Sequence, residues 1–205
     1  MFKEHTIDDF TRILASDIPT PGGGCASALA AATAVSLVSM VASLTIGKKG
    51  YEKTWDRMET IRVEMEKLRQ FFLEAMDLDA DSYREVMDCY KMPKSCEDER
   101  NTRKKAIQGA LYGAAIVPLQ IAEKAVKIFS YAEEVIIKGN KNASSDGAVA
   151  ALMARASVKG ALHNVEINAS SIEDLGRKEE LLDKVRALGT QADQMERKVI
   201  SLTEF

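Results

Sequence analysis

The chain has 205 residues, a formal net charge of −3 and a sequence pI near 5.6. This length supplies one substantial core and favours a single domain over residues 1–205, and the acidic balance argues against a protein built to neutralise nucleic-acid phosphates. Cys25, Cys89 and Cys96 are too widely spaced for a disulfide framework or a CxxC metal site, so a reducing cytoplasm is the expected location.

The first predicted helix is short and follows an N-terminus, MFKEHTIDDF, that lacks the apolar core of a signal peptide. Thr6 and Asp9 have the spacing of a capping box, which predicts a helix over residues 7–16. Pro19 and Pro21 then end it, and three consecutive glycines lead into the next segment.

The next segment, Cys25 to Ile46, contains 22 residues without a charge, which is long enough to cross a bilayer. Thirteen of the 22 are Ala, Ser or Thr, which gain little from lipid, so the composition argues against a membrane span. A helix without a polar face is a buried one. We therefore expect this helix, ending near Gly47, to form the buried centre of the subunit, with protein on all sides.

Two long helical segments follow. Apolar residues recur at spacings of three and four over residues 51–90, which predicts one long amphipathic helix or two in line, stopped by Pro93. A further helix is expected over residues 95–129, with a kink at Pro118, because proline lacks one backbone donor.

The C-terminal third begins with the clearest loop, residues 138–147, which reads KGNKNASSDG and supplies N-caps for a helix over residues 147–170. A final helix carries apolar residues at alternating steps of four and three, which predicts a packing seam. The seam residues are Leu181, Val185, Leu188, Ala192, Met195, Val199 and Leu202. Since no segment alternates with period two, the expected fold is all-α, a single-domain bundle of about six helices around the Ala/Ser-rich central helix.

The three glycines are the first candidate site. Gly22, Gly23 and Gly24 permit backbone geometries closed to other residues and present amide N–H groups at the positive end of a helix dipole, which suits a carboxylate or phosphate. They are equally compatible with a turn into a tightly packed helix. The segment is not a P-loop, because no GK[ST] follows.

Polar residues on two other predicted helices are also candidates. Asp77, Asp79 and Asp81 lie within five residues, and such close acids need solvent, a basic partner or a function; a solvated face is the commoner explanation. Asn164 and Asn168 lie one helical turn apart and either read the donor and acceptor edge of a heterocycle or cap a helix end.

A metal site is not expected. The two histidines, His5 and His163, lie 158 positions apart, and the H-x-E and P-C-x-x-C signatures of zinc deaminases are missing. His163 is best interpreted as a satisfied or surface histidine. Any hydrolysis or deamination is therefore expected to proceed without metal or other cofactor.

Four segments, in this order and at these intervals, resemble the formiminotetrahydrofolate cyclodeaminase / methenyltetrahydrofolate cyclohydrolase family. They are PTPGGGCASALAAATAVSLVSMVASLTIGKKGYE, DLDADSYREVMDCYKMPK, RKKAIQGALYGAAIVPLQIAE and GNKNASSDGAVAALMARASVKGALHNVEINASSIED, and the resemblance extends over residues 6–174. It implies an all-helical, dimeric, metal-free enzyme of tetrahydrofolate one-carbon units. The chain looks like the standalone bacterial type, without the transferase domain of animal members.

The resemblance also implies roles for residues that match the family's motifs. The carboxylates implied as catalytic are Asp77, Asp79 and Asp146. The residues implied to bind substrate are Gly22, Gly23, Gly24, Lys48, Asn164 and Asn168. The glycine amides would lie near folate, the lysine near its glutamyl carboxylate, and the asparagines near the pterin or the carboxylates. The chain departs from the family pattern at Cys25, usually serine, and near Ser43, commonly asparagine.

The resemblance favours hydrolysis of 5,10-methenyltetrahydrofolate to 10-formyltetrahydrofolate, with carboxylates stabilising the amidinium cation and moving protons. The alternative is cyclodeamination of 5-formiminotetrahydrofolate to the methenyl compound and ammonia. A folate-binding protein without catalysis and a structural helical protein are the remaining hypotheses. The expected partners are folate and a second copy of the chain, with neither nucleic acid nor membrane.

Overall fold

The computed structural model describes residues 1–203 and contains, in that range, seven α-helices, three short 3-10 helices and no strand. In chain order the elements are η1 (Phe2–Glu4), α1 (Ile7–Leu14), α2 (Gly23–Ser43), η2 (Glu52–Thr54), α3 (Trp55–Lys91), α4 (Glu97–Ala125), α5 (Ile128–Lys138), η3 (Lys141–Ala143), α6 (Ser144–Ser170) and α7 (Leu175–Ser201). The prediction of an all-α fold is confirmed.

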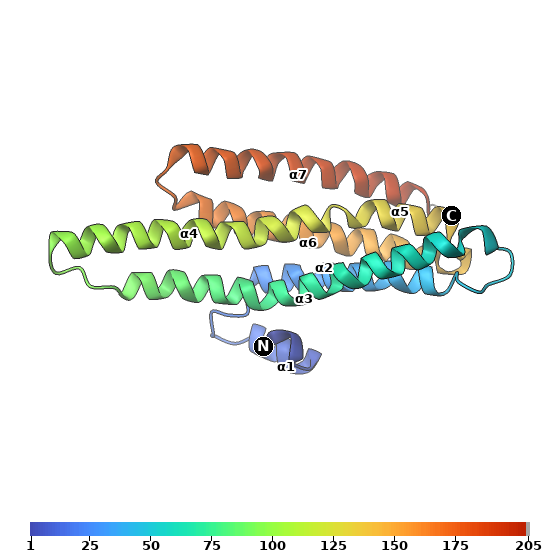
Figure 1. Ribbon diagram of the computed structural model, residues 1–205, viewed down its shortest axis with the longest axis horizontal. Coiled ribbons are helices and arrows are strands. Elements are labelled where there is room, and N and C mark those ends of the chain that lie inside the picture. The colour runs from blue at the N-terminus through green and yellow to red at the C-terminus, as the bar shows by residue number, and fades with distance from the viewer. Residues whose placement is uncertain (204–205) are drawn as a thin grey trace.

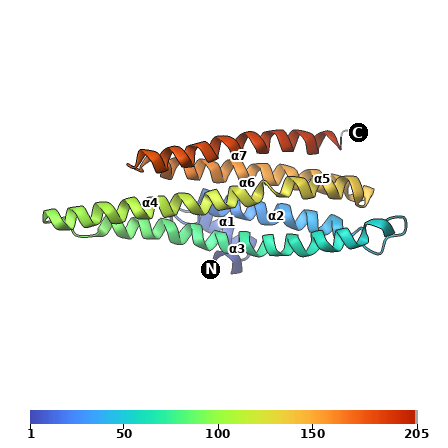
Figure 2. The same ribbon diagram turned by 45° about the horizontal axis from the view of Figure 1, so that its top comes forward.

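The long helices run side by side in an elongated bundle (Figures 1 and 2). Helix α2 packs against α3 and α6, α4 contacts α3 and α6, and α7 lies on α6 and α5. Helices α3 and α4 form an antiparallel hairpin whose tip extends beyond the other helices at the left of Figure 1. The N-terminal segment lies beside α3, with η1 packed on that helix.

Helix α2 is the mostly buried central helix that the sequence predicts. Eleven of its residues are buried. By length and composition alone it is apolar enough to cross a membrane, with a mean hydropathy of 1.9, but 56% of its most apolar window is buried inside the protein, as in the core helix of a bundle. The expectation of protein on all sides is not met within one chain, because one stripe, with Thr33, Ser36 and Met40, is exposed.

Helix α4 continues through Pro118 and ends at Ala125, after which residues 128–138 form α5. Proline has no N–H to donate to the carbonyl four residues earlier, which belongs to Ala114. The side-chain amide of Asn168 on α6 instead donates to this carbonyl at 3.0 Å. A neighbouring helix thus replaces the hydrogen bond that Pro118 removes.

The predicted seam of α7 packs within the chain except at Leu202, which is 42% exposed and lies beyond the end of the helix. The buried seam residues are Leu181, Val185, Ala192 and Val199, and those partly buried against the core are Leu188 and Met195. Full burial of a Leu or Val side chain contributes roughly 1.5–3 kcal/mol to folding. One hydrophobic core extends from Phe10 to Val199. The assignment of residues 1–205 to one cyclodeaminase/cyclohydrolase-like domain stays a prediction, since residues 204–205 lie outside the described part.

Candidate active site

A cavity of about 420 Å³ opens where the N-terminus of α2 meets the second half of α3 and the last turns of α6. Its lining combines polar groups with aromatic and aliphatic side chains, which is typical of small-molecule sites. The lining residues are Pro19, Thr20, Gly22, Gly23, Gly24, Asp79, Ser82, Tyr83, Val86, Met87, Tyr90, Ala114, Asn164, Ile167 and Asn168.

The carboxylate of Asp79 lies against the start of α2. A Cβ added to Gly24 would overlap this carboxylate, so only glycine permits the close approach. No side chain of its own segment caps α2, whose N-cap is Gly22. Asp79 therefore places a negative charge at the positive end of the helix, where free N–H groups are available.

Burial sets the acidity of Asp79. Desolvation raises its pKa above the usual range, while hydrogen bonds from the thiol and the backbone N–H of Cys25 act in the opposite direction. A half-buried carboxyl group with a raised pKa holds a proton more readily than a solvated one. It is therefore suited to general acid and base catalysis.

Cys25 is the main hydrogen-bonding partner of Asp79. Its Sγ lies 3.3 Å from Asp79 Oδ2 and 3.1 Å from the carbonyl oxygen of Met76. Desolvation, followed by the charge of Asp79, raises the pKa of Cys25 to about 12. The thiol is therefore protonated at neutral pH and acts as a donor to the carboxylate.

Substitution of Cys25 is expected to move the acidic limb of the pH–rate profile. The Cys25→Ala variant loses a donor to the carboxylate, so the pKa of Asp79 rises and the limb moves to higher pH. In Cys25→Ser the hydroxyl is a stronger donor than the thiol, so the limb moves to lower pH. Measurement of kcat/KM against pH checks this order, and an identical limb in all three proteins would contradict it.

The two predicted asparagines both lie in the cavity wall. Asn164 Nδ2 donates to the carbonyl of Gly160 at 2.8 Å, and Asn168 Nδ2 donates to the carbonyls of Ala114 and Asn164, each at 3.0 Å. Within residues 1–203, neither side-chain oxygen accepts a hydrogen bond from the protein. These two acceptors are available to the donor edge of a flat heterocycle.

Comparison with known proteins identifies the family. The formiminotransferase-cyclodeaminase family model matches residues 6–187. The chain belongs to this family. It is 36% identical over 199 residues to the methenyltetrahydrofolate cyclohydrolase of Methylorubrum extorquens, with 97% of this chain and 96% of that protein covered. The family membership predicted from the sequence is confirmed.

Two further relatives of this family member carry the cyclodeaminase name. The formimidoyltransferase-cyclodeaminase of Gallus gallus is 31% identical over 195 residues, which cover 95% of this chain but 36% of that protein. The crystal structure of the formiminotetrahydrofolate cyclodeaminase of Thermotoga maritima matches with a TM-score of 0.88 at 30% identity, covering 98% of this chain and 97% of that one.

Asp77 lies outside the cavity of this cyclodeaminase-family chain. Its Oδ1 accepts a hydrogen bond from the backbone N–H of Phe2 at 2.6 Å, and its side chain lines a separate hollow with His5 and Arg84. Asp77 Oδ2 is buried without a protein partner. The geometry of one chain gives Asp77 a role in holding the N-terminal segment, and its predicted catalytic role stays a prediction.

Lys48 and Asp146 also lie away from the cavity, at the opposite end of the bundle. Lys48 Nζ donates to Asn140 Oδ1 at 2.6 Å, just beyond the C-terminus of α2. Asp146 is in the first turn of α6, which runs antiparallel to α2. The 21 residues of α2 span about 30 Å, so one chain does not bring these two residues to the glycine end.

The aromatic wall of the cavity was missed by sequence reasoning. Tyr83, Val86, Met87 and Tyr90 follow Asp79 on α3 and line the same cavity. Steps of three and four on a helix keep side chains on one face. This spacing was the available signal, although it is also the spacing of ordinary core residues.

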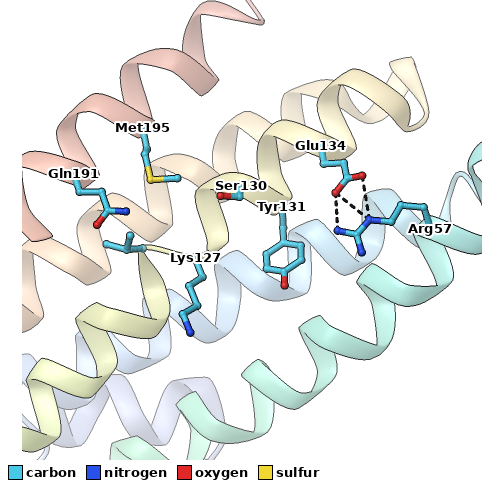
Figure 3. Close-up of a pocket in the computed structure, with 8 residues that line it drawn as sticks. Arg57, Lys127, Ser130, Tyr131, Glu134, Gln191 and Met195 are labelled. Carbon is cyan, nitrogen blue, oxygen red and sulfur yellow. Dashed lines mark hydrogen bonds and ion pairs between the residues drawn. The ribbon is translucent and has the colours of Figure 1, made fainter.

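A second hollow, of about 360 Å³, lies between α3, α5 and α7 (Figure 3). Glu134 accepts hydrogen bonds from Arg57 Nε at 3.1 Å and Nη2 at 2.7 Å, and Lys138 Nζ lies 2.8 Å from the same carboxylate. Arg57 and Glu134, which face each other in Figure 3, therefore form a partly exposed ion pair between α3 and α5.

This ion pair predicts a pH dependence of stability. Hydrogen bonding from Arg57, together with Lys138, lowers the pKa of Glu134 from 4.5 to about 2 against the opposing effect of burial. A lowered pKa stabilises the folded state above pH 4.5, and this contribution is lost as the pH falls toward 2. Thermal unfolding of Arg57→Met should therefore show a smaller loss of midpoint temperature across this interval. If the midpoint temperature falls equally with pH in the variant and the wild type, the Arg57–Glu134 ion pair is not the source of this pH dependence.

Proposed function

We propose that this chain hydrolyses 5,10-methenyltetrahydrofolate to 10-formyltetrahydrofolate, with Asp79 as the central acid and base. The observation that carries the proposal is the half-buried Asp79 carboxyl, placed at the start of α2 in a cavity of about 420 Å³. The relative from Methylorubrum extorquens, similar over nearly its full length, is named for this reaction.

The substrate carries a delocalised amidinium cation at its bridging carbon, and a carboxylate beside that carbon stabilises the positive charge. As water adds to the carbon, Asp79 accepts the water proton. The resulting neutral adduct carries a hydroxyl group and opens by cleavage of the bond to N5, and the protonated Asp79 returns the proton to N5. The hydroxyl proton leaves to solvent as the formyl C=O bond forms. One water is consumed, one proton is released, and the formyl group remains on N10.

Other residues that line the cavity suit a folate bound with its bridging carbon beside Asp79. The side-chain oxygens of Asn164 and Asn168 accept hydrogen bonds from the pterin, and Gly22–24 let its rings approach the backbone. Tyr83 and Tyr90 offer apolar faces to the flat rings. The proposed reaction uses no metal or other cofactor.

The same residues support a second candidate, the cyclodeaminase reaction. In it, N10 attacks the formimino carbon and ammonia departs, so an acid is needed at the leaving nitrogen. Asp79 would supply that proton. The specific observation in favour is the match to the Thermotoga maritima structure, whose name gives this activity.

The two non-catalytic hypotheses make different predictions. A folate-binding protein would keep its affinity when Asp79 is replaced and would turn over neither substrate. A structural protein would show no stabilisation by folate, whereas a ligand at a hundredfold excess over its Kd stabilises by about 2.7 kcal/mol. The α7 seam gives the structural hypothesis no support, because its buried residues pack inside the chain and not against a partner.

We further propose that the protein is a cytoplasmic homodimer that binds neither nucleic acid nor membrane. The formal net charge of −3 supports the first exclusion. The burial of α2 among α3 and α6 supports the second. The exposed, uncharged stripe of α2 supports the homodimer.

A pair of absorbance assays tests the function. Chelator-treated protein is given 5,10-methenyltetrahydrofolate in one cuvette and 5-formiminotetrahydrofolate in the other. Consumption of the methenyl compound alone is the expected result. Formation of the methenyl compound with release of ammonia would favour the cyclodeaminase, and inactivity of folded protein in both cuvettes would contradict the enzyme. Activity restored only by added metal would overturn the cofactor-free mechanism.

A further inference from the structure

The cavity of the proposed active site has its inner end at the start of α2. Asn164 on α6 lies beside Gly23, because a Cβ added to that glycine would lie 3.2 Å from Asn164 Nδ2. Asp79 on α3 lies beside Gly24, the next residue. Two polar side chains from different helices therefore flank the first turn of α2. A folate whose pterin contacts Asn164 and whose bridging carbon lies beside Asp79 occupies this inner end.

The aromatic wall on α3 leads from the inner end to the outside of the cavity. Its residues share one face of the helix, because they follow Asp79 at steps of four, three and four: Tyr83, Val86 and Tyr90. Tyr90 lies about 16 Å along the helix axis from Asp79 and is 45% exposed. Beyond it, α3 and α4 continue as the protruding hairpin (Figure 1). The aryl ring and glutamyl group of a bound folate therefore leave the inner end along this wall.

Arg103 on α4 lies beside the outer end of the wall. Its Nε and Nη2 donate to the carbonyl oxygen of Tyr90 at 3.3 and 2.9 Å, and its guanidinium carbon lies 5.7 Å from the centre of the Tyr90 ring. Ala114, which lines the cavity, follows Arg103 by eleven residues, or about three helical turns, so the two share one face of α4. The wall thus ends beside a positioned positive charge.

The guanidinium of Arg103 has donors available for an anion. Within residues 1–203 it forms no ion pair, and two of its five N–H groups are bound, both to the neutral carbonyl of Tyr90. Other cations of this region are paired with acids, namely Arg84 with Asp81, Lys91 with Asp88 and Lys104 with Glu173. A half-buried arginine in this state is suited to a carboxylate, which it binds with two parallel hydrogen bonds.

The contact between Arg103 and Tyr90 also has a structural effect. Tyr90 is in the last turn of α3, which ends at Lys91, and carbonyls there have no partner within the helix. Arg103 supplies the missing donors and joins the two arms of the hairpin. This contact positions the guanidinium but leaves its charge without an acidic partner. A purely structural role would therefore give no preference for a charged ligand.

We propose that Arg103 binds a carboxylate of the substrate's glutamyl group, so that the site selects folates that carry this charge. The proposal rests on the folate site of the proposed function. Within one chain Lys48, which the resemblance assigns to this carboxylate, lies at the opposite end of α2. Because Arg103 is distant from the reacting carbon beside Asp79, it contributes to substrate binding and not to proton transfer.

Two ligands that differ only in charge test this role. Isothermal titration calorimetry compares 5-formyltetrahydrofolate with its bis-amide, in which both glutamyl carboxylates are replaced by neutral carboxamides. The wild type should bind the carboxylate form about tenfold more tightly, as expected for a charge-assisted contact near the surface. Arg103→Met should bind the two forms alike. Lys105→Met removes an exposed, unpaired charge from the other side of α4 and should keep the wild-type preference.

The same titrations separate binding from structure. If Arg103→Met weakens both ligands equally, Arg103 only holds the hairpin and the proposal is wrong. A wild type that does not distinguish the ligands overturns the proposal without any variant, even where Arg103→Met fails to fold. Arg103→Lys keeps the charge and should keep part of the preference.

The titrations measure binding without turnover, so they also separate this proposal from the proposed function. A wild type that prefers the carboxylate form but turns over neither substrate would contradict the reaction and support the role of Arg103. An active enzyme without the preference would contradict the role of Arg103 alone. Binding of neither ligand would contradict both.

Discussion

The Asp79→Asn variant should lose at least about a hundredfold in turnover while remaining folded. The amide has nearly the same shape as the carboxyl group, but it neither accepts the proton of the attacking water nor balances the substrate cation. Asparagine still accepts a hydrogen bond from the start of α2, so the helix keeps its cap. Steady-state kinetics and thermal unfolding of the same preparation measure the two effects separately.

Asp81→Asn is the matched control. Asp81 is exposed and pairs with Arg84, outside the lining of the cavity. Its substitution should leave turnover close to wild type. Near-normal turnover of Asp79→Asn would remove Asp79 from the catalytic set, and equal losses in both variants would point to a general effect of negative charge.

The Gly24→Ala variant should be nearly inactive and less stable. The added Cβ would overlap the Asp79 carboxylate, which would then have to move away from the start of α2. Such overpacking costs about 1–3 kcal/mol, and displacement of the carboxylate removes the proposed acid and base. Chemical denaturation gives the first quantity and the methenyltetrahydrofolate assay gives the second.

Gly22→Ala provides the comparison. At Gly22 the nearest atom to an added Cβ is the carbonyl oxygen of Pro19 at 3.6 Å, an ordinary contact, and its φ of −125° is accessible to alanine. This variant should fold and turn over much like the wild type. If Gly22→Ala and Gly24→Ala lose the same stability and activity, the close approach of Asp79 to α2 is not the cause.

The sequence predicts α2 well because an uncharged stretch has few stable locations in a protein. It does not predict which face of α2 stays exposed, since that depends on the neighbouring helices. The sequence also does not predict that α4 ends at Ala125. The N–H that Pro118 lacks is replaced by the side-chain amide of Asn168, a residue on another helix. Local propensity cannot anticipate such a tertiary hydrogen bond.

Asp77 and Asp79 show how far the candidate site could be predicted from the sequence. The resemblance assigns Asp77 and Asp79 to one site, but residues two apart on a helix point to different sides. Asp79 accordingly meets Cys25 in the cavity, while Asp77 meets the N-H of Phe2 in another hollow. Helical geometry alone would have separated the two. The placement of Lys48 and Asp146 required the antiparallel course of α2 and α6, which no sequence motif encodes.

A crystal structure of the protein with 5-formyltetrahydrofolate, a stable folate, tests the proposed active site most directly. We expect the pterin in the cavity at the start of α2, with Asp79 and at least one of Asn164 and Asn168 within hydrogen-bonding distance. A folate bound elsewhere, for example in the hollow beside Arg57 and Glu134, with the cavity unoccupied, would contradict this site.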